Sequence, residues 1–124
     1  SDERVSVMQD ATKKLVELRN WFACELTQFD FIESVYPSST NFILLRQKPG
    51  HQVFSVLAKD GIVTRNQNHE PALRNCVRIS IGSQESMLEV ITSLTRYQTE
   101  LEKNQQGKQS QHKETQSQLD KDHI

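Results

Sequence analysis

Residues 76–82, which read CVRISIG, indicate the fold most directly. Apolar residues occupy every second position from 77 to 81, and Arg78 and Ser80 lie between them. This period of two is typical of a strand whose two faces meet different surroundings. The stretch therefore predicts a strand in a sheet, with Arg78 and Ser80 on the face opposite the apolar side chains.

Three further segments are predicted to be strands. Residues 31–36 precede a turn, and the apolar run at 41–46 follows it. Because the second run is short and bounded by turns, it favours a strand near the centre of the sheet with both faces covered. Residues 62–65 form a brief strand. The polar segment 66–75 that follows is predicted to be a loop.

Three helices are expected around these strands. In residues 5–27, apolar side chains recur at three- and four-residue steps, which places them on one face of a helix. A short helix is predicted from Pro49 to Lys59, and Gly61 stands where a left-handed C-terminal cap is expected. Ser83 is a candidate N-cap for the third helix, which carries an apolar stripe at 87–94.

The predicted order is helix, strand, strand, helix, strand, strand, helix. With short connections this order favours an α+β two-layer sandwich, in which helices cover one face of a small, mostly antiparallel sheet. We expect one domain over residues 1–103. Residues 104–124 are polar apart from Leu119 and Ile124. They predict a disordered tail, whose opening could extend the last helix.

The composition excludes several classes of function. The chain has 124 residues, a net charge of -1 and no apolar run long enough for a membrane span, so we expect neither nucleic-acid nor membrane binding. Its two cysteines predict reduced, at least partly buried thiols in a cytosolic protein. The four histidines lack ligand spacing, so no metal site is expected. There is no glycine-rich phosphate loop, and Asp60 and Glu70 are interpreted as solvated loop residues rather than an acid–base pair.

Two arginines are the candidate binding residues. Arg78 lies in the middle of a strand, where it either faces water from the open side of the sheet or presents its planar fork to a carboxylate or phosphate. Arg65 ends the preceding strand. Two guanidinium groups on neighbouring strands can accept a dianionic ligand. His69 and Asn41 are interpreted as ordinary loop and turn residues.

Three motifs resemble those of one enzyme family. Residues 36–46 resemble the pattern S-x-x-N-[FY]-[IL]-L, and residues 61–66 resemble G-I-[IV]-x-R-[DN]. Residues 73–83 resemble L-x-x-C-[LV]-R-I-[ST]-[VI]-G-[ST]. Together these patterns are similar to the histidinol-phosphate aminotransferases, and the resemblance extends from Arg4 to Leu94. The last pattern is shared more widely among pyridoxal-phosphate aminotransferases.

The resemblance implies the carboxyl-terminal small domain of a class II, fold type I aminotransferase. Such an enzyme transfers an amino group between glutamate and imidazole-acetol phosphate in L-histidine biosynthesis. The resemblance assigns Arg78 to the α-carboxylate of the substrate. It assigns Arg65 to the distal carboxylate of glutamate or the phosphate of histidinol phosphate.

The family's cofactor lysine and the other residues that hold pyridoxal phosphate belong to an upstream domain. We therefore expect no catalytic, cofactor-binding or metal-binding residue in this chain, and no activity from the chain alone. The whole enzyme is expected to be a cytoplasmic homodimer.

Two alternatives remain at this point. The chain could be the small domain of a related aminotransferase that acts on aromatic amino acids or aspartate, although the loop around Arg65 and its spacing to Arg78 argue against it. It could also be a free-standing α+β interaction module without catalysis, an interpretation that its polar tail favours.

Overall fold

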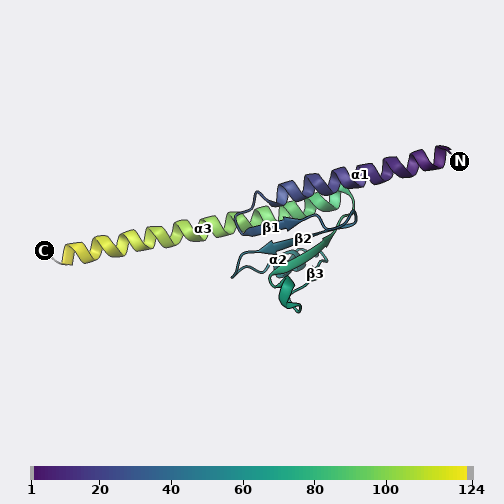
Figure 1. The fold of residues 1–124 in the computed structure, drawn as a ribbon. Coiled ribbons are helices and arrows are strands. Elements are labelled where there is room, and N and C mark those ends of the chain that lie inside the picture. Colours follow the sequence, from purple (N-terminus) through teal and green to yellow (C-terminus); the bar gives the residue numbers. More distant parts are fainter. Residues whose placement is uncertain (1, 123–124) are drawn as a thin grey trace.

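The computed structural model describes the backbone of residues 2–122 and the side chains of residues 10–106. Helices and strands follow one another in the predicted order, and the α+β class is confirmed (Figure 1). The elements are α1 (Asp2–Leu26), β1 (Ile32–Tyr36), β2 (Phe42–Gln47), α2 (Val53–Lys59), β3 (Arg65–Asn66), the short 3-10 helix η1 (Pro71–Leu73), β4 (Cys76–Ser80) and α3 (Gln84–Asp122).

The four strands form one antiparallel sheet in the order β1-β2-β4-β3. β2 is therefore central, as its apolar run predicts. Only one face of β2 is fully buried, however: Ile43 and Leu45 are inaccessible to solvent, whereas Phe42 and Leu44 are partly exposed. The expectation that both faces are covered is wrong for this chain, because the described helices all pack on the side of Ile43 and Leu45.

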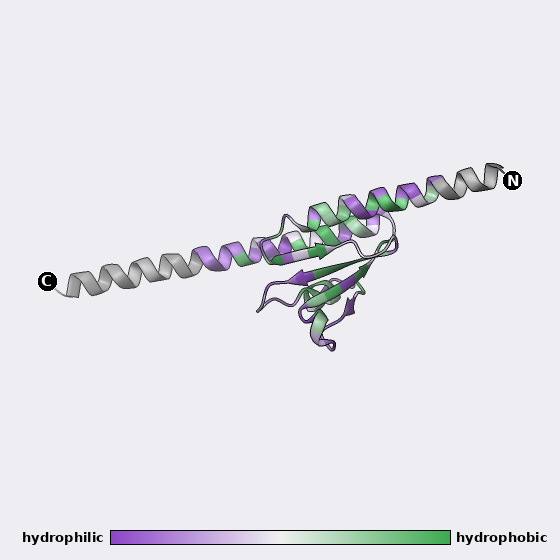
Figure 2. Cartoon of the chain, in the orientation of Figure 1, coloured by the Kyte–Doolittle hydropathy of each residue, from purple (hydrophilic) through white to green (hydrophobic). Residues whose placement is uncertain are grey.

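The core lies between this covered face and the three helices. Each helix contributes an apolar stripe, which is what the three- and four-residue spacing predicts. The buried side chains are Phe22 and Leu26 from α1, Phe29 and Phe31 from the turn after it, Val53 and Leu57 from α2, Met87, Val90 and Leu94 from α3, and Ile32, Ile43, Leu45, Val77 and Ile79 from the sheet. Figure 2 shows the hydrophobic residues of α1 and α3 concentrated where these helices run beside the sheet.

Local signals set the ends of two helices. The Ser83 hydroxyl oxygen accepts a hydrogen bond from the Ser86 amide at 3.1 Å, as an N-cap should. Gly61 has φ 77°, the left-handed conformation predicted for it after α2. α2 begins at Val53, later than the predicted Pro49. The Gln47 side chain accepts the Val53 amide proton at 2.7 Å, so the first turn of the helix is satisfied there.

The predicted strand at 62–65 is wrong in its bounds, because only Arg65 and Asn66 pair with β4. The Ile62 amide still donates to the Leu57 carbonyl, so the chain is completing the turn out of α2 at this point. Val63 is 94% exposed. The polar segment that follows is a loop, as predicted, and includes η1.

The structure differs from the sequence expectation in the polar tail. The opening of the tail was expected to be able to extend the last helix, and α3 in fact continues to Asp122. Residues 123 and 124 lie outside the described part of the chain. Gln, Lys and Glu are good helix formers, and no proline interrupts the segment. The described side chains from 102 to 106 are exposed, so this part of the helix adds nothing to the core. The division into 1–103 and 104–124 stays a compositional prediction.

Candidate anion-binding face of the sheet

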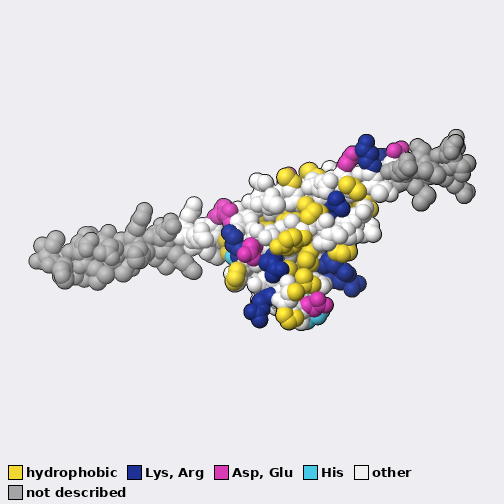
Figure 3. All heavy atoms as spheres, in the orientation of Figure 1, with side chains coloured by type: hydrophobic (Ala, Val, Ile, Leu, Met, Phe, Trp, Pro, Cys, Tyr) yellow, Lys and Arg dark blue, Asp and Glu magenta, His cyan; other side chains and the backbone are white. Residues whose placement is uncertain are grey.

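The face of the sheet opposite the helices carries the candidate residues. In an antiparallel sheet, directly paired residues point to the same side. Tyr36 pairs with Leu44, Leu44 pairs with Arg78, and Arg78 pairs with Arg65, which gives one row across all four strands. We call this side the open face; its residues are Ser34, Tyr36, Phe42, Leu44, Arg46, Arg65, Cys76, Arg78 and Ser80. Figure 3 shows hydrophobic side chains gathered over the strands, with Lys and Arg side chains beside them.

Arg78 is held on the open face by an aromatic ring. Its guanidinium carbon lies 5.0 Å from the centroid of the Phe42 ring, within the range of a cation–π contact. The side chain is half-buried. Within the part of the chain that the structure describes, no carboxylate lies at ion-pair distance from it. Arg78 is therefore a pre-oriented cation whose donors are available to a ligand.

Arg65 lies directly across from Arg78 on the edge strand β3, and it is exposed. Directly opposed residues of an antiparallel pair have Cβ atoms about 4.5–5.5 Å apart, and like charges placed there repel. An anion bound by both guanidinium groups would offset that repulsion. The structure thus brings together the two arginines that the sequence singles out.

Three polar residues of the open face were not anticipated from the sequence. Hydrogen bonds with the side chains of Ser34 and then Arg46 lower the pKa of the Tyr36 phenol, and the same phenol raises the pKa of Arg46. Arg46 is the third arginine of this face. The sequence carries little signal for this role of Arg46, because residues 42–45 are all apolar and no alternation marks one face of β2 as open.

The two cysteines differ in their surroundings. Cys76 is buried on β4, and burial raises the pKa of its thiol. Cys24 on α1 is exposed, so the expectation that both are at least partly buried is wrong for this residue. The two are free thiols.

The remaining loop residues lie away from the arginine pair or make ordinary turn contacts. The Asn41 amide donates to the Ser39 hydroxyl oxygen at 3.2 Å, which agrees with a turn role. His69 is exposed beside Glu70. Asp60 is more than a solvated loop residue, because its carboxylate accepts hydrogen bonds from side chains of α3. Its partners are the Ser93 hydroxyl and the Arg96 guanidinium.

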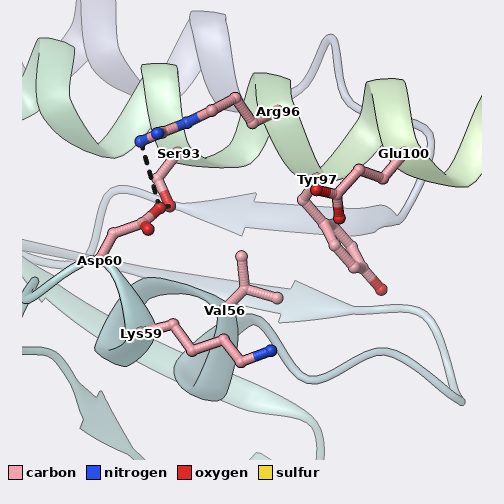
Figure 4. Close-up of a pocket in the computed structure, with 7 residues that line it drawn as sticks. All are labelled: Val56, Lys59, Asp60, Ser93, Arg96, Tyr97 and Glu100. Atoms are coloured by element: carbon pink, nitrogen blue, oxygen red, sulfur yellow. Dashed lines mark hydrogen bonds and ion pairs between the residues drawn. The ribbon is translucent and has the colours of Figure 1, made fainter.

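Figure 4 shows the hollow in which these Asp60 contacts lie. It is open to solvent, has a volume of about 310 Å³ and is lined by residues of α2, α3 and the turn after α2. Because α2 and α3 pack on the covered side of the sheet, this hollow is separate from the arginine pair.

The described side chains do not fit covalent attachment of a cofactor. A lysine that forms a Schiff base is typically desolvated in a pocket. The five lysines whose side chains are described, Lys13, Lys14, Lys48, Lys59 and Lys103, are all exposed. Among the described residues, no three His, Cys, Asp or Glu side chains converge as metal ligands. The chemistry that the open face itself offers is the binding of an anion.

Comparison with known proteins relates this chain to an enzyme family. No family model matches the chain. The histidinol-phosphate aminotransferase of Blochmanniella floridana is 37% identical over 92 residues, which cover 74% of this chain and 26% of the relative. That of Flavobacterium psychrophilum is 36% identical over 89 residues, with 72% and 26% covered. The chain is homologous to one segment of the histidinol-phosphate aminotransferases.

A solved structure supports the same relationship. The histidinol-phosphate aminotransferase of Clostridium acetobutylicum superposes with a TM-score of 0.59 and 26% identity, over 68% of this chain and 26% of that one. The chain thus spans about a quarter of the length of the aminotransferases it matches. In the described part of the chain, none of the helices combines the length and apolar character needed to cross a membrane.

Proposed function

We propose that this chain is the carboxyl-terminal small domain of a histidinol-phosphate aminotransferase, an enzyme of L-histidine biosynthesis. The complete enzyme transfers an amino group between glutamate and imidazole-acetol phosphate. The observation that carries the proposal is the direct pairing of Arg65 with Arg78 on the open face of a domain homologous to these enzymes.

The two arginines divide the recognition of the substrate anions. Arg78, oriented by Phe42, binds the α-carboxylate of glutamate through two parallel N–H donors. Arg65, which is more exposed, binds the distal carboxylate of glutamate or the phosphate of histidinol phosphate. Histidinol phosphate has no carboxylate, so one site must accept two differently placed anions. Two guanidinium groups can bind both substrates, because each substrate can place its anion on a different member of the pair.

Pyridoxal phosphate would be held by the part of the enzyme that this chain does not span. When bound, the cofactor supplies the electron sink for amino transfer. The exposed lysines described above do not fit its covalent attachment, so this chain contributes anion binding and is predicted to be inactive alone. We expect the complete enzyme to be a cytoplasmic homodimer.

Steady-state kinetics of the complete protein containing this chain test the proposal. Arg78→Met should raise the KM for glutamate about 100-fold or more, because two charge-assisted hydrogen bonds are lost. Arg65→Met should raise the KM for both glutamate and histidinol phosphate. The matched control is Arg74→Met, which removes an exposed arginine from the loop between β3 and β4. Unchanged KM values for both variants would refute the proposed roles.

The same assay separates the alternatives. Faster turnover with an aromatic amino acid or aspartate than with histidinol phosphate would indicate a related aminotransferase. The interaction module is favoured by one observation, the polar extension of α3 to Asp122, whose described side chains at 102–106 are exposed. If the complete protein neither binds pyridoxal phosphate nor transfers an amino group, that alternative replaces the proposal.

A further inference from the structure

The third arginine of the open face, Arg46, is engaged with backbone rather than free. Its Nη1 donates to the Arg74 carbonyl at 2.6 Å, and its Nη2 donates to the Ala72 carbonyl at 3.1 Å. Arg46 is half-buried on the central strand β2, where it pairs with Cys76. Its planar fork thus spans two carbonyl oxygens of one loop.

That loop, residues 67–75, connects the strand of Arg65 to the strand of Arg78. The position of Arg65 depends on the pairing of its short strand and on this loop. β3 has only two residues, which pair with Val77 and Arg78. The loop itself is a tight fold with Asn75 at φ 63°, and its amides bond mainly to oxygens within the loop and to Asn66. The described contacts that join it to the sheet include two backbone bonds, from the Gln67 amide to the Cys76 carbonyl and from the Gln47 amide to the Asn75 carbonyl. The fork of Arg46 adds the side-chain contacts to the middle of the loop.

We propose that Arg46 is a positioning residue that holds the 67–75 loop, and through it Arg65, at the distance from Arg78 that the substrate anions require. This inference rests on the proposed function. Arg46 differs from the other two arginines in a decisive respect. Both arms of its fork are already bonded to carbonyl oxygens, whereas no hydrogen bond of the Arg65 or Arg78 guanidinium is present among the described residues.

Arginine suits this role better than lysine. The two carbonyl oxygens belong to residues two apart in sequence, and a guanidinium donates to both at once with fixed geometry. A lysine has one ammonium group on a flexible stem, so it can keep the charge without fixing both carbonyls. Arg46→Lys therefore keeps the positive charge but removes the simultaneous hydrogen bonds to both carbonyl oxygens.

The experiment compares Arg46→Lys and Arg46→Met with wild type in the complete aminotransferase that contains this chain. Both variants should raise the KM for glutamate and for histidinol phosphate by about 10-fold to 100-fold, because the anion-binding pair is misplaced. The value of kcat should change less. Hydrogen exchange of the 67–75 amides should become faster in both variants.

Two controls distinguish positioning from general destabilisation. Leu45→Val weakens the core on the covered face of the same strand and leaves the Arg46 fork intact. Arg74→Lys changes an exposed side chain but keeps the carbonyl that Arg46 bonds. Both controls should retain wild-type KM values. If Arg46→Met does not fold, Arg46→Lys still tests the role of the fork.

The inference is overturned if Arg46→Lys has wild-type KM values and wild-type exchange in the loop. It is also overturned if Leu45→Val raises KM as much as the Arg46 variants do. A different result would indicate that the proposed function itself is wrong: Arg78→Met would then leave the KM for glutamate unchanged. If only this inference is wrong, Arg78→Met still raises that KM.

Discussion

Replacing Thr64 by valine should stabilise this chain. Thr64 immediately precedes Arg65 and is 8% exposed, and its Oγ1 is buried without a hydrogen-bond partner in the part of the chain that the structure describes. A hydroxyl removed from water in this way has lost its hydration and gained nothing in return. Valine has nearly the same shape and carries a methyl group in place of the hydroxyl.

The size of the effect follows from the burial of that one oxygen. Leaving a buried polar group unpaired costs about 1–3 kcal/mol, and the added methyl group gains a little from burial. We expect Thr64→Val to raise the free energy of unfolding by about 1–2 kcal/mol. With a urea slope near 2 kcal/mol per M, the unfolding midpoint should rise by about 0.5–1 M.

Urea unfolding of wild type and variant, followed by circular dichroism, measures this shift. Ser93→Ala is the matched control, since Ser93 is also buried but its hydroxyl donates to the Asp60 carboxylate. That variant should lose stability, by about 1–2 kcal/mol. Opposite signs for the two variants support the reasoning. A loss of stability in Thr64→Val would refute it, because it would mean that the threonine hydroxyl is satisfied in the folded protein.

Three further predictions follow from the described contacts. Ser83→Ala removes the N-cap bond to the Ser86 amide and should lower the unfolding free energy by about 1 kcal/mol, which thermal unfolding would detect. Leu45→Ala leaves a cavity at a fully buried position and should cost about 2–5 kcal/mol in the same assay. Burial raises the pKa of Tyr97 above its ordinary value of 10.0, so the folded state holds this proton more tightly than the unfolded state. That stabilisation is fully present below the ordinary pKa and is lost as the pH rises through the pKa of the folded state. The unfolding midpoints of wild type and Tyr97→Phe should therefore be compared between about pH 8 and 11, where the midpoint of wild type should fall more steeply with pH.

The order and type of the elements could be predicted from the sequence because the signals are local. The period of two in β4, the apolar stripes of the helices, the N-cap at Ser83 and the left-handed Gly61 each depend on neighbouring residues alone. The predicted first and last residues of an element are less accurate where a contact with a residue distant in sequence determines them. α2 begins where the Gln47 side chain satisfies the Val53 amide, and β3 is short because the chain is still leaving α2.

Local sequence patterns are enough to predict that Arg65 and Arg78 lie on neighbouring segments and belong to motifs that resemble those of an aminotransferase. Their direct opposition on an open face could not be predicted in this way, because it depends on strand register and on which side of the sheet the helices cover. The same is true of Arg46. Its partners are 26 and 28 residues away in sequence, and periodicity reports which way a side chain points but not which distant carbonyl it meets.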